Sequence, residues 1–326
     1  MKAIVYKRYG SPEVLQLQEV TKPVPGDYEV LIKVYASCIN DWDWGLLQGK
    51  PFVNRLLFGL IKPKTQILGC DLSGRVEAIG AKVKQFKPGD EVFGDISEGN
   101  WGGFAEYVCA DEKVLALKPA GMSFDEAAAT PQAGLLALQG LLYNGSIQSG
   151  QKVLINGAGG GTGTFAVQIA KLYGAEVTGV DSKVKLEMLR SIGADHVIDY
   201  AQEDFTKNGL RYDLILDVRT NRPVSHYKQA LNAGGTYVTV GGSMPRIFYL
   251  MIFGPLISKM GNKKMSVLMH KPQKKDLIKM SELFDAGKVV PIIDSRYPLR
   301  EVPQALQRFG QGIQKGKIVI TMGDHP

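Results

Sequence analysis

The feature of the sequence that most restricts its fold is a glycine-rich segment at residues 156–163 (NGAGGGTG), between an apolar run at 153–155 and a helix-like segment at 164–173. A dinucleotide pyrophosphate must approach the backbone of such a turn closely, and the free N–H groups of the following helix then face the phosphates. A simple structural turn is the alternative for the loop alone. The residues predicted to bind the phosphates are Ala158, Gly160, Gly161, Thr162 and Gly163.

The position of an acidic residue strengthens this interpretation. Asp181 ends the next predicted strand and lies 23 residues after Ala158, the position where the usual fingerprint has its first glycine. The expected offset for the acid that binds the ribose hydroxyls is about 20 residues. Strand, loop, helix and acid together therefore predict a dinucleotide site.

The residues after Asp181 bear on which dinucleotide is bound. An acid here binds the ribose hydroxyls of NADH and repels a 2′-phosphate. Ser182, Lys183 and Lys185 can donate hydrogen bonds to that phosphate and balance its charge, and Tyr200 can add a hydroxyl. The alternative is a solvated helix start with Asp181 as its N-cap and the lysines in solvent. The two lysines and the net charge of +7 favour NADPH and leave NADH possible.

The pattern of strands and helices divides the chain into two domains. In residues 1–122, short β-rich runs between turn residues, without helical periodicity, predict strands and turns. Residues 287–326 show the same pattern and end in a predicted strand at 317–320. In residues 123–286, continuous apolar strands alternate with helices, which is typical of a parallel sheet covered on both faces. We therefore predict an α/β fold: a β-barrel domain from 1–122 and 287–326, and a doubly wound Rossmann domain at 123–286.

Composition excludes several classes of protein. The three cysteines, Cys38, Cys70 and Cys109, are too few for a disulfide framework or a four-thiolate zinc site, and they favour a reducing, cytoplasmic location. The basic residues are scattered, which argues against a nucleic-acid groove. As a helix, the most apolar window (247–258) is about 18 Å long, short of the ~30 Å hydrocarbon core, so no membrane span is expected.

Several stretches, in combination and order, resemble one family across essentially the whole chain. They are residues 68–80 (LGCDLSGRVEAIG), 86–94 (FKPGDEVFG), 102–108 (GGFAEYV), 129–141 (ATPQAGLLALQGL), 153–171, 189–200 and 316–320 (GKIVI). The chain resembles the medium-chain dehydrogenase/reductase superfamily, and within it the zinc-independent quinone oxidoreductase-like (zeta-crystallin-like) branch. The resemblance implies a GroES-like catalytic domain, a Rossmann domain, an active site in the cleft between them, and a homodimer.

The departures from the zinc-dependent members concern the metal. Those members have a Cys where this chain has Asn40, and Gly-His-Glu where it has Gly69-Cys70-Asp71. A lone thiol in an apolar stretch is most often a small core residue. A catalytic zinc needs three protein ligands, which the sequence does not assemble. We therefore expect no metal.

Without a Lewis acid, the expected substrates are acceptors already activated by conjugation: small lipophilic quinones, enones or enals. The resemblance implies that Asn40 donates a hydrogen bond to the developing enolate or quinol oxygen, and that Asp43 orients its loop. The alternative is that Asn40 is only a turn residue. Trp42 and Trp44 can stack on a flat substrate or pack in the core.

Other positions leave the site incomplete. Leu136 stands where relatives often have Thr, and the tyrosines of some relatives are absent, so water is the expected proton source. Gly241 and Gly242 follow a strand and can let the backbone lie close to the nicotinamide, or they can simply end that strand. This incompleteness keeps a nucleotide-binding sensor with little turnover as an alternative function; a zinc alcohol dehydrogenase is a weaker one.

Two apolar segments have no assigned role. Residues 56–61 and 249–257 can select a lipophilic substrate, or rest on a membrane surface with help from Arg246 and Lys259. Ordinary burial in the core or in a dimer interface is the interpretation that we favour for both segments.

Overall fold

A computed structural model describes residues 1–99, 101–260 and 262–323 of the chain. The chain forms two compact units. The first consists of Met1–Gln132 and Pro272–Pro326, and the second of Ala133–Lys271.

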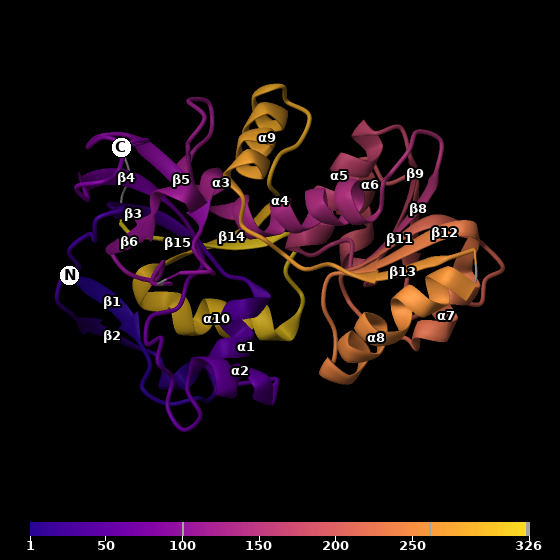
Figure 1. Cartoon of the computed structure of the whole chain (residues 1–326), viewed down its shortest axis with the longest axis horizontal. Helices are drawn as coiled ribbons and strands as arrows, with labels where there is room; N and C mark the ends of the chain where they lie inside the picture. The colour runs from indigo at the N-terminus through magenta and orange to yellow at the C-terminus, as the bar shows by residue number, and fades with distance from the viewer. Residues whose placement is uncertain (100, 261, 324–326) are drawn as a thin grey trace. The chain divides into compact units, whose positions relative to one another are not determined.

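The second unit is built on a six-stranded sheet in which every pair of neighbouring strands is parallel (Figure 1). The strand order is β10-β9-β8-β11-β12-β13, with bounds β8 (Lys152–Asn156), β9 (Glu176–Asp181), β10 (His196–Asp199), β11 (Tyr212–Asp217), β12 (Leu231–Thr239) and β13 (Lys264–Val267). The helices are α4 (Pro131–Leu138, continued by a π-helical turn at Gln139–Asn144), α5 (Gly161–Leu172), α6 (Leu186–Ser191, preceded by a 3₁₀ turn at Lys183–Lys185), α7 (Val224–Ala230) and α8 (Met244–Met260).

The central strands of this sheet are apolar at consecutive positions, because α5 and α6 cover one of its faces and α7 and α8 cover the other (Figure 1). Val153, Leu154 and Ile155 in β8 are completely buried, as are the central residues of β11. This is the burial that a parallel, doubly wound sheet requires. The prediction of a Rossmann-type sheet is confirmed.

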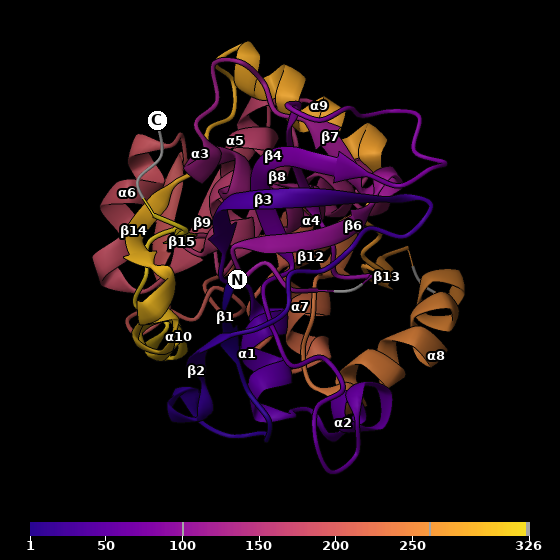
Figure 2. The ribbon, with the colours of Figure 1, turned by 90° about the vertical axis from the view of Figure 1, so that its left-hand side faces the viewer.

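The first unit contains a seven-stranded, mostly antiparallel sheet with the order β14-β15-β3-β4-β5-β7, and β6 pairs with β3 (Figure 2). Its strands are β3 (Glu29–Cys38), β4 (Asp71–Ile79), β5 (Glu91–Asp95), β6 (Tyr107–Asp111), β7 (Leu115–Leu117), β14 (Ile293–Pro298) and β15 (Lys317–Thr321); β1 (Lys2–Val5) and β2 (Gln16–Glu19) form a separate hairpin. Short 3₁₀ turns lie at Pro12–Val14, Glu112–Val114 and Leu299–Glu301. The pairing of β15 with β3 brings the C-terminal part of the chain back beside Cys38.

The first unit also contains helices in stretches for which we expected only strands and turns, so that expectation was wrong. They are α1 (Asp41–Gln48), α2 (Phe52–Phe58) and α10 (Val302–Gln311). In α10, Val302, Ala305 and Leu306 recur at helical spacing and are completely buried, whereas Gln304 and Gln307 are exposed. Apolar residues do recur with the period of an amphipathic helix in this segment, but over only about three turns. The glycines near the segment instead favour a prediction of loops.

The boundaries between the two units differ from the expected domain boundaries. Helix α3 (Phe124–Ala129) packs against β3 and β4, and helix α9 (Lys274–Asp285) contacts β7. Both helices therefore belong to the first unit, whereas we assigned residues 123–286 to the nucleotide-binding domain. Among the described residues, no helix combines the length and the apolar character needed to cross a bilayer.

The packing of α10 leads to a test of the first unit. The Leu306 side chain is completely buried in the apolar core. Leu306→Ala should lower the free energy of unfolding by about 2–5 kcal/mol, because it removes buried methyl groups and leaves a cavity. All three tryptophans, Trp42, Trp44 and Trp101, lie in the first unit, so urea unfolding followed by tryptophan fluorescence measures this change directly. The exposed neighbour is the control: Gln307→Ala should shift the midpoint little, and equal losses for both variants would contradict the packing of α10.

Candidate functional site

The glycine-rich loop joins β8 to α5, and the two elements approach each other closely. A Cβ atom on Gly163 would lie 2.3 Å from the Gly157 carbonyl oxygen and 2.5 Å from Ala158 Cα, so only glycine fits there. A Cβ atom on Gly160 would come no closer than 3.6 Å to its nearest neighbour, again the Gly157 carbonyl oxygen. Because α5 begins at Gly161, the N–H groups of its first turn have no partner inside the helix. A loop of this kind can hold a phosphate group.

Asp181 is tied to this loop. Its Oδ2 accepts a hydrogen bond from the Gly159 N–H at 2.8 Å, and its Oδ1 accepts one from the Ser182 N–H at 2.8 Å. The Lys185 ammonium lies 3.4 Å from Oδ1, and both side chains are buried. Lys183 is exposed. The alternative in which both lysines point into solvent is therefore wrong for Lys185 and holds for Lys183.

The structure also places the other residues predicted to bind the nucleotide. Tyr200 is half exposed, and its N–H donates to the Asp181 carbonyl oxygen. Gly242 has a φ of +131°, and a Cβ atom there would lie 2.6 Å from Thr220 Oγ1, so the turn itself requires this glycine. Gly241 has no atom within 4 Å of a Cβ position. The contact of these residues with a nicotinamide stays a prediction.

Sequence reasoning missed a buried hydrogen-bond network at the carboxyl edge of the same sheet. Asn156 Nδ2 donates to Asp217 Oδ1 at 2.8 Å, and the Tyr237 hydroxyl donates to Asp217 Oδ2 at 2.6 Å. Asn156 also donates to the Arg219 carbonyl oxygen at 2.8 Å. The network fixes the residue that opens the glycine-rich loop. The available signal in the sequence was a polar residue at the end of each of two apolar strands, Asn156 in β8 and Asp217 in β11.

In the first unit, Asp43 joins the loop of Asn40 to the segment before β4. Its carboxylate accepts hydrogen bonds from the N–H groups of Asn40 and Gly69, both at 2.8 Å. Burial raises the pKa of Asp43 to about 7, although these two hydrogen bonds lower it. Asn40 itself is the N-cap residue of α1, with an extended backbone.

The side chain of Asn40 lies between a buried lysine and a buried aspartate. Lys317 Nζ donates to Asn40 Oδ1 at 2.5 Å and lies 3.7 Å from Asp71 Oδ2. Asn40 Nδ2 donates to Asp71 Oδ2 at 2.9 Å and to Cys70 Sγ at 3.3 Å. The predicted hydrogen bond from Asn40 to a substrate oxygen would thus require the amide to give up one of these partners, and it stays a prediction. We missed Lys317, although a lysine at the start of the apolar run 317–320 was a signal.

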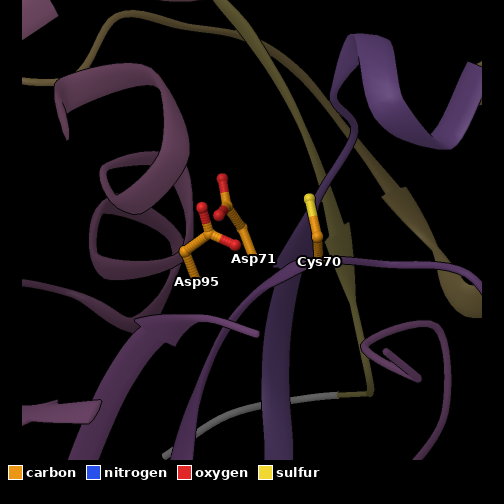
Figure 3. Close-up of side chains that lie close together, drawn as sticks. All are labelled: Cys70, Asp71 and Asp95. Atoms are coloured by element: carbon orange, nitrogen blue, oxygen red, sulfur yellow. The ribbon is translucent and has the colours of Figure 1, made fainter. Parts of the chain in front are cut away.

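A buried polar cluster in the first unit is formed by Asn40, Asp43, Cys70, Asp71, Asp95 and Lys317. Three of these side chains have the composition of a metal site. Among the residues that the structure describes, Cys70, Asp71 and Asp95 have ligand atoms within 4.8 Å of one another (Figure 3). All three side chains are completely buried, and in Figure 3 the carboxylates of Asp71 and Asp95 point toward each other. Burial raises the pKa of Cys70, and the charges of Asp43 and Asp71 raise it further, which disfavours the thiolate that binds metals.

The aromatic and apolar residues of unassigned role are distributed as follows. Trp44 packs against the apolar core beside Phe309, whereas Trp42 is 42% exposed and lies edge-on to Phe58. Core burial is wrong for most of the two apolar segments, because most of their large side chains are exposed, but it holds for Leu250, which is buried in a core cluster that Ile257 also contacts. The exposed side chains are Leu56, Leu57, Leu60 and Ile61 in and after α2, and Tyr249, Met251, Ile252, Phe253 and Leu256 in α8. The homodimer and the membrane contact stay predictions.

Comparisons with known proteins agree with this architecture. Residues 192–320 match the family model described as "Zinc-binding dehydrogenase", and residues 26–120 match "Alcohol dehydrogenase GroES-like domain". A 2-methylene-furan-3-one reductase of Solanum lycopersicum is 34% identical over 98% of this chain and 79% of its own length. A chloroplastic NADPH-dependent alkenal/one oxidoreductase of Arabidopsis thaliana is 31% identical over the same shares. The structure of the quinone oxidoreductase from Coxiella burnetii has a TM-score of 0.89 and 29% identity, with 99% of each chain covered.

The position of Asp43 leads to a stability prediction. Asp43→Asn should lower the free energy of unfolding of the first unit by about 1–3 kcal/mol, because the new amide nitrogen faces an N–H group that then has no acceptor. Urea unfolding followed by tryptophan fluorescence measures the loss. Asp41→Asn, on the exposed side of the same helix turn, is the control and should change stability by less than about 1 kcal/mol. Unchanged stability of Asp43→Asn would show that the two hydrogen bonds do not support the loop.

Proposed function

Because the chain belongs to the medium-chain dehydrogenase/reductase superfamily, in its quinone oxidoreductase-like branch, we propose that it reduces quinones or α,β-unsaturated carbonyl compounds with NADPH. The observation that carries the proposal is the close approach of Gly163 to Gly157 and Ala158, which leaves no room for a Cβ atom between the first turn of α5 and the loop after β8. A turn this tight in this place is the form of a pyrophosphate site.

The residues of the second unit would hold the cofactor in two places. The first-turn N–H groups of α5 would bind the pyrophosphate, with Gly160 leaving space for it. Asp181 and Lys183 would lie at the adenine ribose. Because Lys185 lies 3.4 Å from Asp181, it offsets the negative charge that would otherwise repel a 2′-phosphate. Exposed Lys183 remains available as a donor to that phosphate.

The substrate class follows from chemistry and from the names of the relatives. When bound, a reduced nicotinamide supplies a hydride, and the acceptor must also gain a proton. Quinones, alkenals and 2-methylene-furan-3-one share a carbon–carbon double bond conjugated to a carbonyl group, which accepts hydride without a Lewis acid. We propose water as the proton source. Asn40 and Asp43 position the loop of the first unit, and zinc takes no part.

Activity tests the proposal. The wild-type chain should oxidise NADPH with saturation when given a simple quinone or an alkenal, in buffer that contains a zinc chelator. Gly160→Ala should raise the KM for NADPH at least about tenfold, because the new methyl group enters the phosphate site, and it should leave the melting temperature unchanged because the position has room. Gly163→Ala should lose both binding and stability.

The control for these glycine variants is Gly121→Ala, where an added Cβ atom meets nothing within 4 Å. It should match the wild type in activity and melting temperature. Tight NADPH binding without turnover on any of these acceptors would instead support a nucleotide-binding sensor. Activity that requires added zinc would support the zinc alcohol dehydrogenase.

The choice between the two dinucleotides gives a second test. Lys183→Glu should weaken NADPH by at least about tenfold and leave NADH nearly unchanged, because only NADPH carries the 2′-phosphate that the new carboxylate repels. Competition between the two nucleotides, followed by fluorescence, measures the ratio of the dissociation constants for NADPH and NADH. Lys152→Glu is the control, because this lysine is exposed at the opposite edge of the same sheet, where β8 begins. Equal loss of both nucleotides would contradict a 2′-phosphate contact at Lys183.

A further inference from the structure

The buried polar cluster of the first unit contains three side chains that could ligate a metal ion, but their lone pairs are already engaged by other groups. Cys70, Asp71 and Asp95 could offer a sulfur and two carboxylate oxygens, which with one water would complete a tetrahedral zinc site. Such a site requires that the lone pairs of these atoms face a common point that holds no other positive charge. The contacts of each atom decide whether that condition is met.

The lone pairs of Cys70 and Asp71 already face hydrogen-bond donors. Cys70 Sγ accepts from Asn40 Nδ2 and from Gln132 Nε2, both at 3.3 Å. Asp71 Oδ1 accepts from the Gln132 N–H at 3.0 Å, and Oδ2 accepts from Asn40 Nδ2 at 2.9 Å. A metal ion would have to displace these donors from buried positions, and each would then lack a partner.

The position of Lys317 adds a charge to this argument. Its ammonium group lies 3.7 Å from Asp71 Oδ2, and it donates to Asn40 Oδ1 and, at 3.3 Å, to the Ile39 carbonyl oxygen. The side chain is 3% exposed, so water screens its charge little. A divalent cation beside Asp71 would therefore meet a buried positive charge at close range.

The ammonium group also determines the orientation of Asn40. A lysine can only donate hydrogen bonds, so the amide oxygen of Asn40 must face it and the amide nitrogen must face away. The nitrogen then meets Cys70 Sγ and Asp71 Oδ2. Lys317, Asn40 and Asp71 thus form one directed chain of donors and acceptors, in which each member fixes the next.

We infer that the Lys317 ammonium takes the electrostatic place of the metal ion in this cluster, so that the chain carries its own cation there and does not take up zinc. The side chain neutralises Asp71 directly and orients Asn40 so that its N–H groups cover the remaining lone pairs. Removing the ammonium should therefore turn the cluster into a site for a divalent cation. This inference does not depend on the proposed substrate or on turnover.

Cobalt binding tests the inference, because cobalt replaces zinc at such sites and its bond to a thiolate absorbs in the near ultraviolet. The wild-type chain should bind no stoichiometric cobalt or zinc and should show no such band. Lys317→Ala should bind cobalt at least about tenfold more tightly than the wild type, with the band, and added zinc should raise its melting temperature. The added variant Cys70→Ser in the Lys317→Ala chain should remove the band.

Lys315→Ala is the matched control, because this lysine is exposed two residues earlier in the chain, and it should behave as the wild type. Lys317→Met, which keeps most of the apolar stem, replaces Lys317→Ala if the shorter side chain prevents folding. A folded Lys317 variant that binds cobalt no better than the wild type would overturn the inference. Stoichiometric zinc in the wild-type chain, with a thiolate band on cobalt exchange, would overturn it without any variant.

Discussion

The ammonium group of Lys317 is the charge on which the polar interior of the first unit depends. Asp43, Asp71 and Asp95 are all completely buried in this unit, and the buried ammonium group of Lys317 lies 3.7 Å from Asp71 Oδ2. Burial raises the pKa of Asp71, and Lys317 opposes that rise. Desolvating a carboxylate costs several kcal/mol, so the arrangement holds only where hydrogen bonds and an opposite charge offset that cost. The lysine therefore stabilises the cluster as well as shaping it.

The cluster also links folding to chain topology. Lys317 belongs to β15, and β15 pairs with β3, so the ammonium group reaches Asn40 across 277 residues of sequence. The cluster can form only after the C-terminal strand has joined the sheet. A bond of such long range adds to the loop-closure entropy that folding must overcome.

The separation in sequence between contacting residues explains which parts of the site could be predicted from the sequence. The glycine-rich loop and Asp181 lie within one strand–helix–strand unit, so their spacing in the sequence already reflects their spacing in the structure. The contact of Lys317 with Asn40 has no such signature. Sequence patterns describe local backbone geometry, and they do not register a hydrogen bond between distant strands. Helix α10 was missed for a related reason, because its short amphipathic pattern becomes clear only when the core that covers Leu306 is known.

In both units a lysine neutralises a buried aspartate, but substitutions at the two pairs should have different effects. The pair of Lys185 and Asp181 is local, four residues apart, and its side chains retain 6% and 10% exposure. The pair of Lys317 and Asp71 is non-local, with 3% and 0% exposure, and it shares its atoms with Asn40. Because loss of a partner costs more when the remaining charge is fully buried, substitutions at the second pair should lower the free energy of unfolding more, whereas those around the first should mainly alter the proposed preference between NADPH and NADH. The proposed preference for one dinucleotide should therefore change by substitution more readily than the proposed exclusion of a metal ion.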